Sequence, residues 1–224
     1  MRTAWVVLRK DLRVESRTLE TLPAMILLAL VTFVIFHFGL NRDTISGQEA
    51  GGVLTVALLF SAMLGINRLF VAEREQGGFD AFLLAPVDRS AMMVAKATGL
   101  FIYLTVLEVV AVPAFKLFLL GPSLGPSLGG VVLVLVLANL AFAVIGTLVS
   151  GIAVNTRARD LIGPMIGLPL LVPALIATAR ALGPLMVTVH ASTGPPLKWL
   201  AILALYDLVF ALLAYALFDF LLEE

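Results

Sequence analysis

The chain contains no cysteine and few charged residues, and each of these shortages excludes a class of function. Without cysteine there is no disulfide, no zinc–cysteine site and no catalytic thiol. Charged residues make up only 13% of the 224 residues, against 61% hydrophobic residues, and a soluble domain of this size exposes too much surface to be so apolar. The net charge of zero argues against a nucleic-acid partner. The composition therefore indicates a single membrane domain, residues 1–224, whose excess apolar surface faces lipid.

The sequence also lacks the residue patterns of a nucleotide-binding or metal-dependent enzyme. None of its four lysines belongs to a Gly-Lys-Ser/Thr motif, so the chain has no phosphate-binding loop of its own. Its two histidines, His37 and His190, are far apart and lack metal-ligand spacing. We therefore expect no catalytic residue, metal or cofactor in this chain, and we expect any ATP that drives it to be bound and hydrolysed by a partner subunit.

Six apolar stretches are long enough to cross a bilayer, which takes about 17–25 residues for each helix. They comprise residues 22–40, 51–69, 97–115, 128–154, 161–179 and 199–218. Backbone N–H and C=O groups cannot stay unpaired in hydrocarbon, so each stretch must be helical or buried in protein, and the alternating pattern of a membrane β-barrel is absent. The sequence predicts an all-α integral membrane protein with about six transmembrane helices.

The basic residues are unevenly distributed, and their distribution predicts the orientation of the spans. If the N-terminus is inside, eleven of the 15 basic residues lie on the inner side, and only Arg42, Lys116, Arg180 and Lys198 lie outside. Cytoplasmic loops carry such an excess of Lys and Arg. We therefore expect both termini of this multi-pass protein to be cytoplasmic.

Residues 1–21 form a separate element before the first span. Its apolar and basic residues fall on different helical faces, with Trp5, Leu8, Leu12 and Leu19 on one face and Arg9, Arg13 and Arg17 on another. This segregation predicts an amphipathic elbow helix that lies in the cytoplasmic interface and leads into the first span. A merely solvated helical tail is the alternative.

Residues 72–96 form a charged cytoplasmic loop between the second and third spans. The residues that characterise it are Glu73, Arg74, Glu75, Gly77, Phe82, Leu83 and Pro86. They combine a dense set of charges with apolar side chains at helical spacing, followed by a proline. A short amphipathic helix of this kind suits docking into a groove on a cytoplasmic partner. The alternative is a solvated loop that only contributes to the inside excess of charge.

The same region carries a family resemblance. Residues 73–77 (EREQG), residues 83–87 (LLAPV) and Lys96 resemble the cytoplasmic loop of ABC-2-type export permeases. Residues 68–70 (RLF) and 168–173 (LPLLVP) make the chain more specifically similar to the haem exporter protein B (CcmB) family of the cytochrome c maturation system. The number of spans and the amphipathic N-terminal segment agree with this family, so the resemblance covers nearly the whole chain.

The resemblance implies the permease subunit of an ABC transporter complex in the bacterial cytoplasmic (inner) membrane. Its function would be haem export, or ATP-driven release of a haem-loaded chaperone, in cytochrome c biogenesis. The implied partners are an ABC ATPase subunit, a second copy of this chain, a haem-handling membrane protein and a haem chaperone, and residues 73–86 match the element expected to touch the ATPase. The resemblance implies haem as a possible substrate. Haem ligation by this chain is not expected, because its only tryptophans, Trp5 and Trp199, form no haem-handling motif. An ABC-2 exporter of a lipid, glycan or drug and a non-transporting membrane assembly scaffold remain open.

Polar residues within or beside the spans are further candidate sites. Glu108 and Asp207 lie near the middle of the third and sixth spans, where an unpaired charge costs about 2.5–3.5 kcal/mol. They are candidates for a proton relay or a substrate contact, or for protonated carboxyls that bond across helices. His37, near the outer end of the first span, and His190, in an outer loop, are candidate haem ligands. The simpler interpretation of His37 is a hydrogen bond to a neighbouring carbonyl group.

Small residues at four-residue spacing occur in two spans. Gly146 with Ser150 and Gly163 with Gly167 are patterns that favour close helix contacts in membranes. They fit either a seam between two copies of the chain or packing within one chain, and the sequence does not choose between these two uses.

Overall fold

The computed structural model describes residues 2–40, 44–70, 89–120, 127–154, 159–187 and 194–221, and these ranges contain helices and no strand. The helices that are long and apolar enough to cross a membrane are α2 (Thr21–Gly39), α3 (Gly47–Arg68), α6 (Arg89–Phe115), α7 (Leu128–Val154), α8 (Arg159–Leu182) and α9 (Leu197–Leu221). A π-helical turn, η1 (Lys116–Leu120), extends α6, and a 3₁₀ turn, η2 (Gly183–Leu185), follows α8. The predicted all-α membrane fold with six spans is confirmed.

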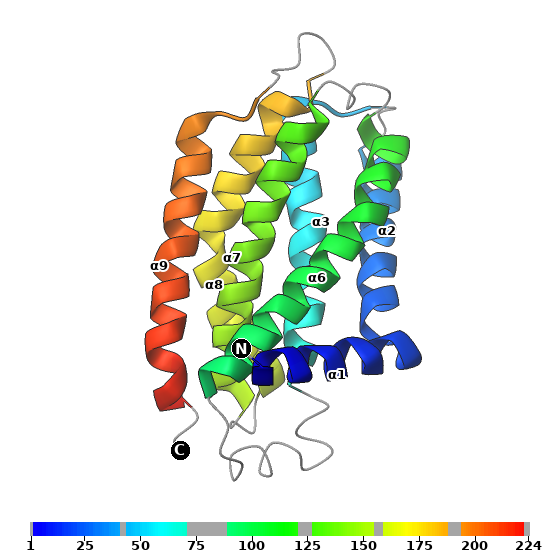
Figure 1. The fold of residues 1–224 in the computed structure, drawn as a ribbon. Helices are drawn as coiled ribbons and strands as arrows, with labels where there is room; N and C mark the ends of the chain where they lie inside the picture. The colour runs from blue at the N-terminus through cyan, green and yellow to red at the C-terminus, as the bar shows by residue number, and fades with distance from the viewer. Residues whose placement is uncertain are drawn as a thin grey trace.

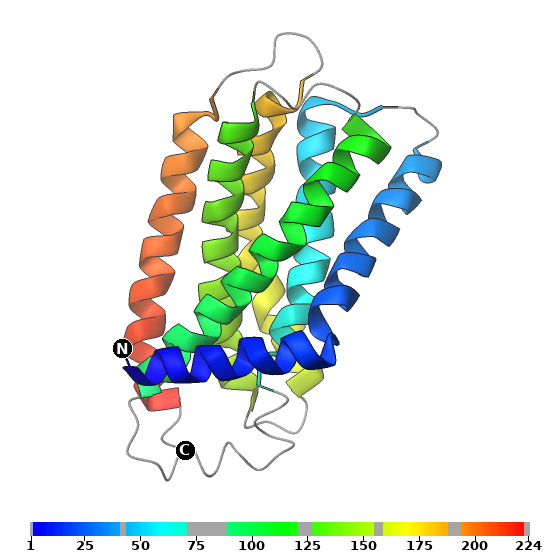
Figure 2. The same cartoon turned by 45° about the vertical axis from the view of Figure 1, so that its right-hand side comes forward.

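The spanning helices form one bundle, and α1 (Arg2–Thr18) lies across one end of it (Figure 1). α1 and the last described residue of α9, Leu221, lie at this end, which we call the terminal end; the opposite end is the far end. Figure 2 shows α1 crossing the terminal end of α6 at a steep angle, and α1 and α6 pack against each other. The sequence signal for a separate N-terminal element therefore corresponds to a helix that runs across the ends of the spans.

The interior of the bundle is built around α3 and α7. Buried residues make up 67% of the apolar stretch of α3 and 56% of that of α7, against only 17% in α2 and 17% in α9. α3 and α7 are therefore central, whereas α2 and α9 bury few of their side chains. In a membrane protein this exposed apolar surface is the surface that faces lipid.

Small residues allow α3 and α7 to approach closely. A Cβ atom on Gly146 would lie 2.5 Å from Ile66 Cγ1, which is too close for two carbon atoms. One turn further along α7, the Ser150 hydroxyl donates a hydrogen bond to the Ile66 carbonyl oxygen at 2.8 Å. Gly167 of α8 likewise faces the Val149 side chain. Of the two uses that the sequence left open for these residues, the structure shows packing within one chain.

The helices begin and end near the predicted limits, with one difference that bears on the site. The third spanning helix, α6, begins at Arg89 and so includes the last residues of the predicted 72–96 loop. α8 continues through Pro164, Pro169 and Pro173 without ending. Neighbouring helices in a membrane bundle allow such prolines, because the backbone groups that they free find other partners.

Candidate functional site

The predicted ATPase-coupling residues lie between α3 and α6, where residues 71–88 are outside the described ranges. This applies to Glu73, Arg74, Glu75, Gly77, Phe82, Leu83 and Pro86, so their coupling role stays a prediction. The structure does describe the two ends of the segment, residues 68–70 after α3 and residues 89–96 at the start of α6. These two ends show how the segment is attached to the bundle.

An apolar cluster, which we call the loop-anchor cluster, fixes both ends of this segment. It consists of Phe70, Met92, Met93, Val144, Leu148 and Ala214. Phe70 follows α3, the two methionines belong to the first turns of α6, and the other residues come from α7 and α9. Phe70 is 4% exposed and Met92 only 1% exposed. Both ends of the segment therefore pack directly against α7 and α9.

A buried ion pair ties the start of α6 to α1. Lys96 Nζ lies 2.9 Å from Asp11 Oδ2, and the Lys96 side chain is only 4% exposed. The ammonium group also lies 5.4 Å from the centre of the Phe70 ring, within reach of a cation–π contact. One lysine therefore joins the elbow helix, the start of α6 and the residue that leads out of α3.

The other end of α1 is fixed to the start of α2. The Glu15 carboxylate accepts hydrogen bonds from the backbone N–H groups of Thr21, at 2.9 Å, and Leu22, at 2.7 Å. Both groups lie in the first turn of α2, where backbone donors lack partners within the helix. Glu20 pairs with Arg68 at the end of α3, at 3.5 Å and largely in the open. Asp11 and Glu15 thus join α1 to α6 and to the start of α2, and Glu20, just after α1, adds an exposed pair with α3.

Glu108 is hydrogen-bonded across helices inside the bundle. Asn139 of α7 donates from Nδ2 to Glu108 Oε2 of α6 at 2.9 Å, and both side chains are buried. The sequence analysis missed Asn139, which lies in a long apolar run and carries no charge. Its only available signal was that it is an amide within a span, where such side chains commonly bond across helices.

Asp207 lies at nearly the same depth on α9. With a rise of about 1.5 Å per residue, Asn139 is about 17 Å from the far-end start of α7, and Asp207 is about 15 Å from that of α9. Asp207 is 3% exposed, and neither of its carboxylate oxygens has a hydrogen-bond partner within the described ranges. The structure thus places Glu108, Asn139 and Asp207 in one layer of three helices that contact each other.

His37 is held at the far end of α2 by a backbone carbonyl group. Its Nδ1 atom lies 2.7 Å from the carbonyl oxygen of Phe118 in η1. The simpler of the two interpretations, a hydrogen bond to a carbonyl, agrees with this geometry. The other candidate haem ligand, His190, lies outside the described residues. In the part of the chain that the structure describes, no group of three His, Asp or Glu side chains could hold a metal ion.

The fold and these contacts define a polytopic α-helical membrane protein whose terminal end is braced by a transverse elbow helix. The chain belongs to the CcmB protein family, whose family model matches residues 2–218. It is 28% identical over 175 residues to the heme exporter protein B of Rhodobacter capsulatus, covering 78% of this chain and 79% of the relative. The heme exporter protein B of Paracoccus denitrificans is 30% identical over 177 residues, which cover 78% of this chain and 80% of the relative. The heme exporter protein B of Bradyrhizobium diazoefficiens is 26% identical over 209 residues, which cover 91% of this chain and 90% of the relative.

Proposed function

We propose that the chain is the permease subunit of an ABC transporter complex that serves haem export in cytochrome c maturation. The observation that carries this proposal is the family match over residues 2–218, together with curated relatives named heme exporter protein B. The six spanning helices agree with a permease. Haem is then the substrate, and ATP is bound and hydrolysed by a separate subunit.

The proposed partners are an ABC ATPase, a haem-handling membrane protein and a haem chaperone. The proposed location is the bacterial cytoplasmic (inner) membrane, with the terminal end of the bundle facing the cytoplasm. The basic side chains of α1, α3 and α6 at this end support the orientation, because cytoplasmic ends of spans carry the excess of Lys and Arg. The homodimeric core implied by the family resemblance stays a prediction.

The coupling mechanism that we propose is mechanical. Closure of the ATPase would push on residues 73–86, and the helices on either side would shift as rigid bodies. The loop-anchor cluster supports this route, because it packs both ends of the segment against α7 and α9. The Lys96–Asp11 pair supports it as well, since α1 would have to move together with α6.

Charge reversal in the proposed coupling segment tests this function. We expect Glu73→Lys with Glu75→Lys to abolish copurification of the ATPase and to prevent restoration of c-type cytochromes in a strain that lacks the gene. Glu20→Lys is the matched control, since Glu20 lies at the same end of the bundle, is largely exposed and lies outside the segment. ATPase binding that survives the double reversal unchanged would contradict the coupling role.

Two variants of the proposal differ in what the ATPase cycle achieves. In one, haem crosses the membrane; in the other, ATP hydrolysis releases a haem-loaded chaperone from its membrane partner. Reconstituted vesicles with confirmed ATP hydrolysis separate them, because only the first accumulates haem in the lumen. A vesicle that hydrolyses ATP but neither accumulates haem nor releases the chaperone would favour the assembly scaffold or another exported substrate.

A further inference from the structure

The outward face of α1 carries a row of arginines that the fold does not use. Arg9, Arg13 and Arg17 recur at every fourth residue and all three are exposed. The opposite face of the helix does the packing, with Leu8 buried and Asp11 paired to Lys96. Within the described ranges, no carboxylate lies at ion-pair distance from the three guanidinium groups. Their charge is therefore available to a ligand outside the chain.

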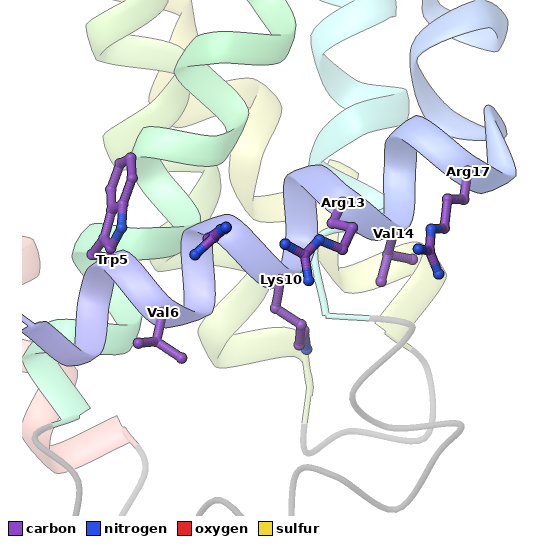
Figure 3. Close-up of a pocket in the computed structure, with 7 residues that line it drawn as sticks. Trp5, Val6, Lys10, Arg13, Val14 and Arg17 are labelled. Carbon is purple, nitrogen blue, oxygen red and sulfur yellow. The ribbon is translucent and has the colours of Figure 1, made fainter.

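The row borders a shallow groove of about 370 Å³ along α1. Its lining combines the arginines with Lys10 and with three apolar side chains, Trp5, Val6 and Val14. Figure 3 shows Trp5 directed toward the spanning helices, whereas Val6 and Lys10 point to the opposite side. Arg13 and Arg17 lie between these two sides, on the flank of the helix that faces away from the bundle.

This geometry matches the layers of a membrane surface. Figure 2 shows α1 running across the ends of the spans, so a row of residues along α1 runs parallel to the membrane plane. Residues four apart on a helix are about 5–6 Å from each other, so neighbouring guanidinium groups can bind neighbouring phosphates, each through two hydrogen bonds. Trp5 is 63% exposed and points to the deeper side, which is the position that tryptophan prefers at the boundary of headgroups and acyl chains.

We propose that this face of α1 is a binding site for anionic phospholipid headgroups, with Arg9, Arg13 and Arg17 as the phosphate ligands and Trp5 as the acyl-chain contact. Charge complementarity selects a lipid of net negative charge, since zwitterionic headgroups neutralise their own phosphate. Trp5 selects a lipid over an acidic protein, because it offers an apolar contact toward the bilayer interior. The site goes beyond the proposed transport function and depends only on the membrane placement of the chain.

Quenching of Trp5 by brominated lipids tests the site on the full chain in nanodiscs of phosphatidylcholine and phosphatidylglycerol. The bromine is carried either by the phosphatidylglycerol or by the same mole fraction of phosphatidylcholine. The sequence has only two tryptophans, so the Trp5 signal is the difference between the wild type and Trp5→Phe. Trp199 lies at the start of α9, at the far end, and the signal that remains in Trp5→Phe serves as an internal reference.

We expect brominated phosphatidylglycerol to quench Trp5 at least about twofold more than brominated phosphatidylcholine, since each arginine near an anionic surface contributes up to about fivefold in binding. The triple variant Arg9→Gln, Arg13→Gln and Arg17→Gln should abolish the difference, and the matching triple Lys variant should keep most of it. All three side chains are exposed, so equal thermal stability of the two triple variants is expected. If the triple Gln variant does not fold, Arg13→Gln alone replaces it and should lower the ratio.

Equal quenching by the two lipids in the wild type would overturn the site. So would a preference that persists in the Gln variants. Loss of the copurified ATPase in the triple Gln variant, with the quenching ratio unchanged, would also overturn it and assign the arginines to a protein contact.

Discussion

Removing the charge of Asp11 is expected to destabilise the terminal end of the bundle strongly. The Lys96 ammonium group is 4% exposed and lies 2.9 Å from this carboxylate, so Asp11→Asn removes a close counter-ion from a buried charge. Removing one partner of a buried pair costs about 3–5 kcal/mol. We expect about 3 kcal/mol, the lower limit of that range, because Asp11 itself is 16% exposed. For a chain of this size, the loss corresponds to a Tm that is lower by about 6–12 °C.

The partner substitution has a smaller effect. Lys96→Met keeps the apolar contacts of the lysine stem, and Asp11 retains access to solvent and a contact with Lys10 at 3.4 Å. We expect a loss of about 1–2 kcal/mol, and the double variant Asp11→Asn with Lys96→Met should be more stable than Asp11→Asn alone. The assay is thermal unfolding of the purified full chain in one detergent, and all variants are compared in a double-mutant cycle.

Glu20→Gln is the matched control for this cycle. It removes a carboxylate at the same end of the bundle, but from a pair at 3.5 Å whose side chains are 45% and 67% exposed. Such surface pairs contribute less than about 1 kcal/mol. The reasoning is refuted if Asp11→Asn lowers the Tm no more than Glu20→Gln, or if the effects of Asp11→Asn and Lys96→Met simply add.

Three further predictions concern the spans. Asn139→Leu removes the hydrogen bond to Glu108 and should lower the free energy of unfolding by about 0.6–2 kcal/mol. Glu108→Gln should lower it less. A lower Tm for Glu108→Gln than for Asn139→Leu would contradict this account of the bond. Gly146→Ala places a Cβ atom 2.5 Å from Ile66 and should cost about 1–3 kcal/mol, and part of this loss should disappear in an Ile66→Ala background. His37→Gln, which can still donate to a carbonyl group, should keep c-type cytochrome levels normal by haem staining, and a selective loss would instead assign a haem contact to His37.

The sequence was sufficient to predict the spans and the elbow helix. The length and apolarity of a span can be read from a continuous stretch of sequence. A continuous apolar stretch of about 20 residues crosses the bilayer as a helix, because its backbone groups then pair within the stretch. The segregation of Arg9, Arg13 and Arg17 from Leu8 and Leu12 is equally local, and α1 buries Leu8 while it exposes the arginines. Local periodicity does not reveal which face packs on which neighbour, so the contact of α1 with α6 emerged only from the structure.

The contacts between segments that are far apart in the chain could not be predicted from the sequence. Lys96 and Asp11 are 85 residues apart, and both sit among other charged residues that offered equally plausible partners. The hydrogen bond expected for His37 is made to Phe118, a carbonyl group that nothing in the local sequence identifies. Such pairings depend on the angles at which the helices cross, and these angles arise from the packing of the whole bundle.

Haem staining of covalent c-type cytochromes after deletion of the gene tests the proposed function most directly, with b-type cytochromes in the same membranes as the internal control. The proposed role in haem export for cytochrome c maturation predicts a selective loss of c-type cytochromes that the intact gene restores and the Glu73→Lys, Glu75→Lys variant does not. Normal c-type cytochromes in the deletion strain, with no second copy of the gene to compensate, would contradict this role and favour the export of another substrate.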